Sequence, residues 1–162
     1  MASGNRVIGS KTNKPAQVRG VSFFWSNWSS QFWTKGMVDR MVDEFNVELV
    51  RAAYGVDDDG TPYDATNEAK LREVVNAAID RDIYVIIDWH THGAHKNVAA
   101  AKDFLGRMAE EYGQYDNVIF EVFNEPTDIA WTEVKAYAEQ VIPVIRQHSD
   151  NLVVVGTTMW SQ

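Results

Sequence analysis

The stretch YVIIDWH at positions 84–90 decides the fold class of this chain. Its first four residues are apolar without interruption, and polar side chains appear only from Asp88 onward. A strand that is buried on both faces has such a continuous apolar run, whereas a strand with one face in water alternates. The run LVVV at positions 152–155 has the same character. The two runs therefore predict strands of a parallel sheet.

Five β-rich runs, these two among them, follow one another along the chain. They start roughly 29 to 36 residues apart, which is about the length of one strand–helix–strand unit. The predicted strands are Val18–Trp25, Val47–Tyr54, Ile83–His90, Val118–Asn124 and Leu152–Trp160.

Amphipathic segments separate these strands and predict four helices. The first helix follows Thr34, a residue type that caps helices, and has apolar side chains at positions 37, 38, 41, 42 and 45. The others are predicted at about 67–81, 97–112 and 131–148. Gly113 is typical of a helix end, and Pro143 should bend the last helix.

Strand, helix and strand repeated in this order give either a doubly wound sheet or part of a (β/α)8 barrel. No glycine-rich phosphate loop follows the first predicted strand, which argues against a nucleotide-binding doubly wound sheet. No linker or change of composition divides the chain. The prediction is one α/β domain over residues 1–162, a partial (β/α)8 TIM barrel with strands one to five and four intervening helices.

The composition restricts the partners. The 162 residues include 15 basic and 23 acidic side chains, for a net charge of −8. Such a surface repels phosphate backbones and anionic lipids, so we expect neither nucleic acid nor a membrane as partner, and a neutral substrate fits better. The absence of cysteine excludes a disulfide framework. Residues 1–16 contain no apolar run of the kind found in a signal peptide.

Polar and aromatic residues stand at the C-terminal end of every predicted strand, where α/β folds collect functional groups. Glu125 is the most informative of them. It lies between Asn124 and Pro126, at a point where proline prevents the strand from continuing. Glycoside hydrolysis requires a carboxyl group that first donates and then accepts a proton. The alternative for Glu125 is a turn residue ahead of the fourth helix.

Four motifs together resemble the bacterial endoglucanases of glycoside hydrolase family five. The resemblance covers nearly the whole chain, in order and in spacing. The motifs are VRAA at 50–53, YVIIDWH at 84–90, NVIFEVFNEP at 117–126 and VGTTMWSQ at 155–162.

The resemblance implies a role for individual residues. Glu125 matches the acid/base of an endo-β-1,4-glucanase that retains the anomeric configuration, and Asn124 matches the asparagine that holds the sugar 2-hydroxyl. Arg51 matches the arginine that orients the nucleophile, and His90 a histidine of the cleavage subsite. Substrate contacts are expected from Trp28, Tyr54, His92 and Trp160. The implied substrate is a β-glucan or cello-oligosaccharide, and no cofactor is implied.

A complete barrel of this type has eight strands and roughly 250 residues. The family's nucleophile is a glutamate of strand seven, which the resemblance places beyond Gln162. Residues 1–162 are thus expected to form an incomplete catalytic domain, completed by a C-terminal half or by further copies in a homo-oligomer. The alternative is a half-barrel that binds β-glucan without turnover. The parent enzyme is expected to be secreted, with its leader outside this sequence.

Two patterns suggest metal sites instead. His90, His92 and His95 alternate in a way that can present imidazoles to one side, as in zinc-dependent amidohydrolases, but that class uses strand one and further ligands on later strands. The acidic segment 57–60 resembles a calcium loop but lacks the remaining EF-hand spacing. The prediction is a rim loop and a solvated turn, without a metal.

Overall fold

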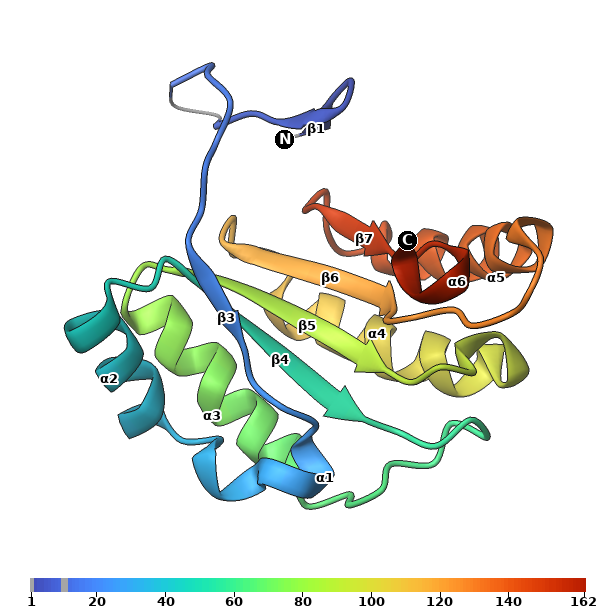
Figure 1. Ribbon diagram of the computed structural model, residues 1–162, viewed down its shortest axis with the longest axis horizontal. Coiled ribbons are helices and arrows are strands. Elements are labelled where there is room, and N and C mark those ends of the chain that lie inside the picture. Colours follow the sequence, from blue (N-terminus) through green and yellow to red (C-terminus); the bar gives the residue numbers. More distant parts are fainter. Residues whose placement is uncertain (1, 10–11) are drawn as a thin grey trace.

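The computed structural model describes residues 2–9 and 12–162. Its centre is a curved sheet of five parallel strands in the order β3-β4-β5-β6-β7 (Figure 1). The strands are β3 Gly20–Ser22, β4 Leu49–Gly55, β5 Tyr84–His90, β6 Val118–Phe123 and β7 Val153–Val155. Neighbours in the sheet are also neighbours in sequence, so the predicted α/β succession of strands and helices is confirmed.

Four long helices connect the strands and lie along the outer face of the sheet (Figure 1). They are α2 Lys35–Phe45, α3 Asn67–Asp80, α4 Val98–Tyr112 and α5 Trp131–Ile145. Thr34 caps α2 as predicted, because its hydroxyl accepts a hydrogen bond from the Met37 amide. Pro143 lies inside α5, which ends at Ile145 rather than at His148.

Short elements complete the chain. A hairpin of β1 Ala2–Ser3 and β2 Arg6–Val7 projects away from the sheet (Figure 1). The remaining elements are α1 Ser26–Ser29, η1 Ser30–Phe32, η2 Ala94–Lys96 and α6 Thr158–Ser161. Among the residues described, no helix is long and apolar enough to cross a membrane.

The two outer strands are shorter than predicted. The first run, Val18–Trp25, forms a strand only over Gly20–Ser22, because it pairs on one side alone and the chain enters α1 at Ser26. The last run, Leu152–Trp160, ends as a strand at Val155. There the Gly156 amide donates to the Phe123 carbonyl, and a Cβ at this glycine would collide with backbone oxygens of the β6 end. The chain therefore turns into α6.

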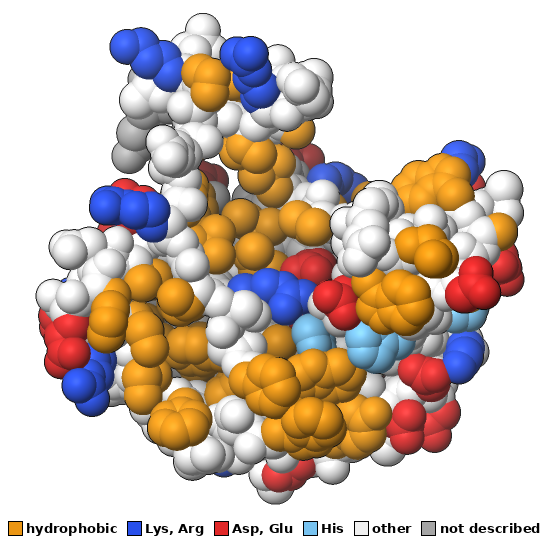
Figure 2. All heavy atoms as spheres, viewed as in Figure 1, with side chains coloured by type: hydrophobic (Ala, Val, Ile, Leu, Met, Phe, Trp, Pro, Cys, Tyr) orange, Lys and Arg blue, Asp and Glu red, His pale blue; other side chains and the backbone are white. Residues whose placement is uncertain are grey.

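The two faces of the sheet differ in whether helices cover them. The outward side chains of β4, β5 and β6 are buried against the helices and form the core. None of the described elements forms a layer over the inner face, and its apolar residues, such as Leu49, Ile86 and Ile119, are only half-buried. Figure 2 shows this face as a hollow lined by hydrophobic side chains, with charged side chains at its centre.

Candidate active site

The charged centre of the hollow is built by three adjacent strands. Arg51 comes from β4, Asp88 and His90 from the end of β5, and Glu121 from β6. All three strands are parallel, so their C-terminal ends meet at one edge of the sheet, where the β6–α5 turn adds Asn124. The sequence predicted this edge as the site, and the structure brings the expected Arg51, His90 and Asn124 together with Asp88 and Glu121, which were not among the expected site residues.

Arg51 is the hub of the site. Its Nε donates to Glu121 Oε2 over 2.7 Å, and its Nη2 donates to Glu121 Oε1 over 2.9 Å. Nη2 also lies 2.6 Å from Asn124 Oδ1 and 2.8 Å from Asp88 Oδ2. On the other side Nη1 donates to Ser22 Oγ over 3.2 Å. The guanidinium is therefore held on two edges in a nearly buried position.

Burial shifts the protonation of the groups around Arg51. It raises the pKa of Asp88 to about 7, against the opposing effect of the Arg51 charge. It also raises the pKa of Glu121, while the hydrogen bonds from Arg51 act in the opposite direction. The pKa of His90 is lowered to about 3, by burial first and by Arg51 second. His90 is consequently neutral at neutral pH, with Nδ1 at 2.5 Å from Asp88 Oδ2.

Glu125 stands at the rim of this network. Its side chain is 44% exposed, whereas that of Glu121 is 9% exposed, so Glu125 can reach a ligand in the hollow. His92 lies beside it, with Nδ1 at 3.2 Å from the Glu125 carbonyl oxygen and 3.9 Å from Oε2. Because a carbonyl oxygen can only accept, the His92 ring must donate from Nδ1.

An aromatic group flanks the histidines. Trp25 is at its centre, with its ring edge-on to His90 at 4.2 Å between centroids and 5.6 Å from the His92 ring. The rings of Trp28 and Tyr63 lie 6.1 and 6.2 Å from that of Trp25. Figure 2 shows hydrophobic side chains gathered next to the pale blue histidines. Trp28 is 69% exposed, so its ring offers a flat apolar face to a ligand.

Two members of this group, Trp25 and Tyr63, were not among the residues expected to contact substrate. Trp25 was visible as the last residue of the first predicted strand, at the same edge as the other site residues. Tyr63 belongs to the loop after β4, where no periodic pattern marks a residue as facing the site. Only the folded loop brings its ring beside Trp25.

The expectation for Tyr54 was wrong. It was expected to contact substrate, but it is completely buried on the outer face of β4. Its ring stacks on Phe104 of α4 at 4.9 Å and lies 6.4 Å from the Trp89 ring. Side chains alternate along a strand, so a residue three positions after the inward Arg51 points outward. Tyr54 is therefore a core residue.

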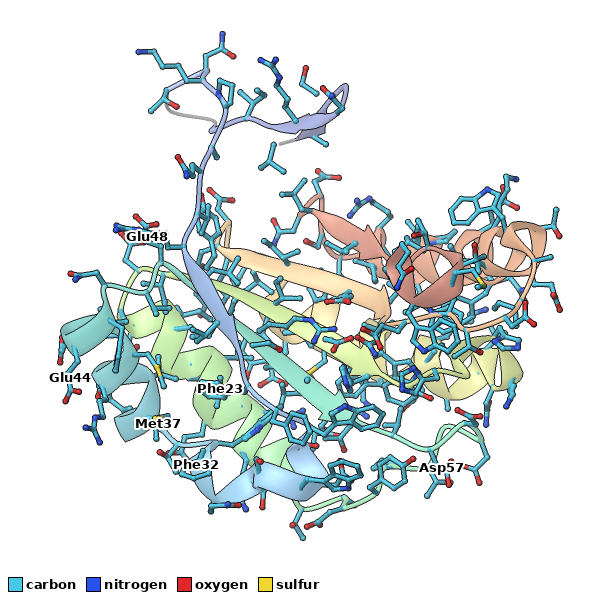
Figure 3. All side chains as sticks on the ribbon, viewed as in Figure 1. Phe23, Phe32, Met37, Glu44, Glu48 and Asp57 are labelled. Carbon is cyan, nitrogen blue, oxygen red and sulfur yellow. The ribbon has the colours of Figure 1, made fainter. Side chains whose placement is uncertain are left out.

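The other expected residues lie near the site or away from it. Trp160 lies in α6, whose backbone bonds to the Pro126 carbonyl beside the Asn124–Pro126 turn, and its side chain is half exposed. Glu48 lies away from the site, at the N-terminal end of β4, where it pairs with Arg19. Figure 3 labels Glu48 there and Asp57 beyond the opposite end of the strand.

The histidine and aspartate patterns do not converge. Among the residues described, no group of three or more His, Cys, Asp or Glu side chains is arranged to hold a metal ion. The His95 ring stacks on Phe123 at 5.8 Å, away from His90. In the acidic loop, Asp58 pairs with Lys96 at 2.5 Å and accepts from the Thr91 hydroxyl. The loop is thus tied by an ion pair to the end of η2, just before α4.

Comparisons with known proteins agree with this geometry. The family description "Cellulase (glycosyl hydrolase family 5)" matches residues 9–162. Endoglucanase Z of Dickeya dadantii is 41% identical over 99% of this chain. A solved structure from Cytophaga hutchinsonii is 42% identical, with a TM-score of 0.92 over 99% of the chain. The catalytic domain of a Thermobifida fusca endoglucanase, solved in complex with cellotetraose, is 29% identical with a TM-score of 0.88.

The matched proteins are longer than this chain. It covers 39% of endoglucanase Z and 54% of each of the two solved chains. The five parallel strands and their helices superpose on that share of the family 5 catalytic domain, which confirms the predicted partial (β/α)8 barrel.

Proposed function

Because the chain belongs to the cellulases of glycosyl hydrolase family 5, we propose that the protein containing it is an endo-β-1,4-glucanase that cleaves with retention. Glu125 is the proposed acid/base. The observation that carries the proposal is the contrast between this half-exposed carboxyl group and the buried Arg51 network beside it. A group that exchanges protons with substrate must be reachable, whereas groups that hold the site in place need not be.

The reaction has two steps in this proposal. Glu125 first protonates the glycosidic oxygen that leaves, while a second carboxylate attacks the anomeric carbon. Glu125 then removes a proton from the water that releases the sugar. Glu121 does not fit the part of the nucleophile, because both its oxygens accept hydrogen bonds from Arg51. The resemblance assigns that part to a glutamate of barrel strand seven, which Arg51 would orient.

The substrate proposal rests on the surroundings of Glu125. Asn124 offers an amide for a sugar hydroxyl, although its Oδ1 is engaged by Arg51. The exposed ring of Trp28 and the half-exposed ring of Trp160 supply apolar faces on which pyranose rings can stack. A net charge of −8 favours a neutral polymer such as β-1,4-glucan. Since cellulose is an insoluble polymer, we also propose that the whole protein acts outside the cell.

The open sheet needs further strands to close. β3 and β7 are the two edges of the five-stranded sheet, and its inner apolar face is uncovered. Exposed strand edges and large apolar faces recruit partners. We propose that the remaining barrel strands cover this face in the whole protein, and that further copies of the chain do so where these strands are missing. Native mass spectrometry of the 162-residue chain distinguishes a monomer from such an assembly.

Glu125→Gln in the full-length protein tests the function. We expect kcat on cello-oligosaccharides to fall by about 10²- to 10⁴-fold. On an aryl cellobioside with a good leaving group, kcat/KM should fall far less, because that leaving group needs no proton, whereas kcat should still fall because the second step has lost its base. Glu139→Gln, in an exposed pair with Lys135, is the matched control and should keep full activity.

Two results would count against the proposal. An inverted product in the NMR spectrum would exclude retention. Binding of cello-oligosaccharide without turnover, unchanged by Glu125→Gln, would indicate a glycan-binding module instead.

A further inference from the structure

The contact between Arg51 and Glu121 joins two nitrogens of one side chain to two oxygens of the other. Arg51 reaches from β4 past β5 to β6, and its Nε and Nη2 meet the two oxygens of one carboxyl group. Such a two-point contact fixes the plane of the guanidinium as well as its position. The pair is nearly buried, and a buried ion pair contributes little to stability compared with a well-packed apolar pair. Its presence at the site therefore calls for a role other than stability.

The other neighbours of Arg51 fix its orientation less completely. Asp88 meets Nη2 alone, and its Oδ2 is shared with His90 Nδ1. Asn124 also meets Nη2 alone. A contact at a single nitrogen allows the guanidinium to rotate about it. Glu121 is thus the neighbour that determines which edge of Arg51 turns toward the open hollow.

We propose that Glu121 is a positioning residue, which holds Arg51 so that the Nη1 edge faces the hollow where the second carboxylate of the reaction has to lie. Nη1 contacts the hydroxyl of Ser22 on the edge strand β3, and the Arg51 side chain remains 19% exposed. One edge of the guanidinium is therefore locked to β6, while the Nη1 edge is held only by the Ser22 hydroxyl of the edge strand. The inference rests on the proposed function, because it assigns Glu121 a task in that same site.

The isosteric variant Glu121→Gln isolates this role. A glutamine offers one acceptor oxygen and one amide donor, so it can accept from only one of the two Arg51 nitrogens and repels the other. In the full-length protein we expect kcat to fall about 10- to 100-fold with KM nearly unchanged, because the substrate contacts remain. Glu121→Asp keeps the charge and should recover part of the activity.

The pH profile separates positioning from a general structural effect. An arginine aligned with a carboxylate lowers the pKa of that carboxylate by one to three units. With Arg51 misaligned, the acidic limb of kcat/KM should move to higher pH by about one unit. Asp88 and His90 also face Arg51, as does the charge of Glu125, and all three are unchanged in the variant.

A surface pair provides the matched control. Nε of Arg72 contacts both oxygens of Glu111 at 3.1 and 2.9 Å, on the outer helices. Glu111→Gln makes the same chemical change away from the site, and its kcat and pH profile should equal those of the parent.

Two readouts keep the inference and the proposed function apart. The Nε–Hε NMR signal of Arg51 should sharpen and shift downfield in the parent relative to Glu121→Gln, whether or not the protein is active on β-glucan. An active parent with unchanged kcat, pH profile and Arg51 signal in Glu121→Gln would overturn the positioning role and leave the proposed function standing. An inactive parent whose Arg51 signal changes in the variant would overturn the function and support the positioning role. If Glu121→Gln does not fold, Glu121→Asp with full activity and an unchanged acidic limb would also overturn the positioning role.

Discussion

Replacing either of two buried tyrosines by phenylalanine should change the free energy of unfolding in opposite directions. Tyr54 of β4 and Tyr137 of α5 are both in the core and are 0% and 2% exposed. The Tyr137 hydroxyl donates to the Val122 carbonyl of β6 over 2.7 Å. The Tyr54 hydroxyl has no hydrogen-bond partner among the residues described, and its ring stacks on Phe104. Replacing each by phenylalanine removes only the oxygen, so the hydrogen bond is the main difference.

The expected magnitudes follow from the two surroundings. A hydrogen bond within the protein contributes about 1 kcal/mol net, so Tyr137→Phe should lower the free energy of unfolding by about 1 kcal/mol or slightly more. A buried hydroxyl without a partner costs about 1 to 3 kcal/mol of lost hydration. Tyr54→Phe should therefore raise the free energy of unfolding by about 1 kcal/mol, and the two variants should differ by about 2 kcal/mol.

Urea denaturation followed by tryptophan fluorescence measures this difference. With a slope of about 2 kcal/mol per molar urea, the midpoints of the two variants should lie about 1 M apart. If Tyr54→Phe is destabilised as much as Tyr137→Phe, its hydroxyl is hydrogen-bonded and the reasoning fails. Tyr54→Phe should also leave KM for cello-oligosaccharides unchanged. A several-fold rise in KM would restore Tyr54 as a substrate contact and refute its placement in the core.

Two further predictions concern the loop after β5 and the buried histidine. In a thermal unfolding assay, Gly93→Ala should destabilise the protein by about 1 to 3 kcal/mol, because the new Cβ would collide with the Asp58 carboxylate. The control Gly36→Ala in α2 places its Cβ where it meets no atom, so in the same assay it should be neutral or stabilising by up to about 1 kcal/mol. The pKa of His90 is lowered to about 3, from about 6.5 in the unfolded chain, so the stability of its neutral form is present above pH 6.5 and is lost as the pH falls toward 3. Asp88, with its pKa raised to about 7, acts in the opposite direction, since its stability is present at acid pH and is lost as the pH rises to 7. Compared with the parent, His90→Asn should therefore gain about 1 kcal/mol or more in free energy of unfolding between pH 7 and pH 4, as measured by urea titrations at both pH values. Equal pH dependence of the two proteins would contradict the buried neutral histidine.

Much of the fold could be predicted because burial leaves a local signal. The inner strands β4, β5 and β6 are covered by helices on their outer face and are rich in apolar residues, so their positions were correct to within a few residues. The edge strands β3 and β7 have a neighbour on one side only, and the apolar run there does not determine where pairing ends. Their limits depend on tertiary contacts, such as the bond from the Gly156 amide to β6.

The edge of the sheet that forms the candidate site was predictable for a related reason. Parallel strands bring their C-terminal ends together whatever their sequence, so residues at those ends become neighbours. The face of the sheet to which each side chain points was harder to predict. Counting in twos from Arg51 would have placed Tyr54 outward, and the expectation of a substrate contact ignored that parity. Tyr63 depends on the path of a loop, for which the sequence provides no such count.

The parity of Glu121 could not be decided by counting, because β6 is irregular at this point. Glu121 and Asn124 are three residues apart, so a regular strand would direct them to opposite faces, yet both accept hydrogen bonds from Arg51. The register between β6 and β7 shifts between Glu121 and Phe123. Such an irregularity re-aims the residues that follow it. In a regular strand, Asn124 would turn toward the helices and Arg51 would lose that acceptor. The shift thus brings the positioning carboxylate and the Asn124-Glu125 pair to the same hollow, and the lengths and apolar patterns of the strands do not encode it.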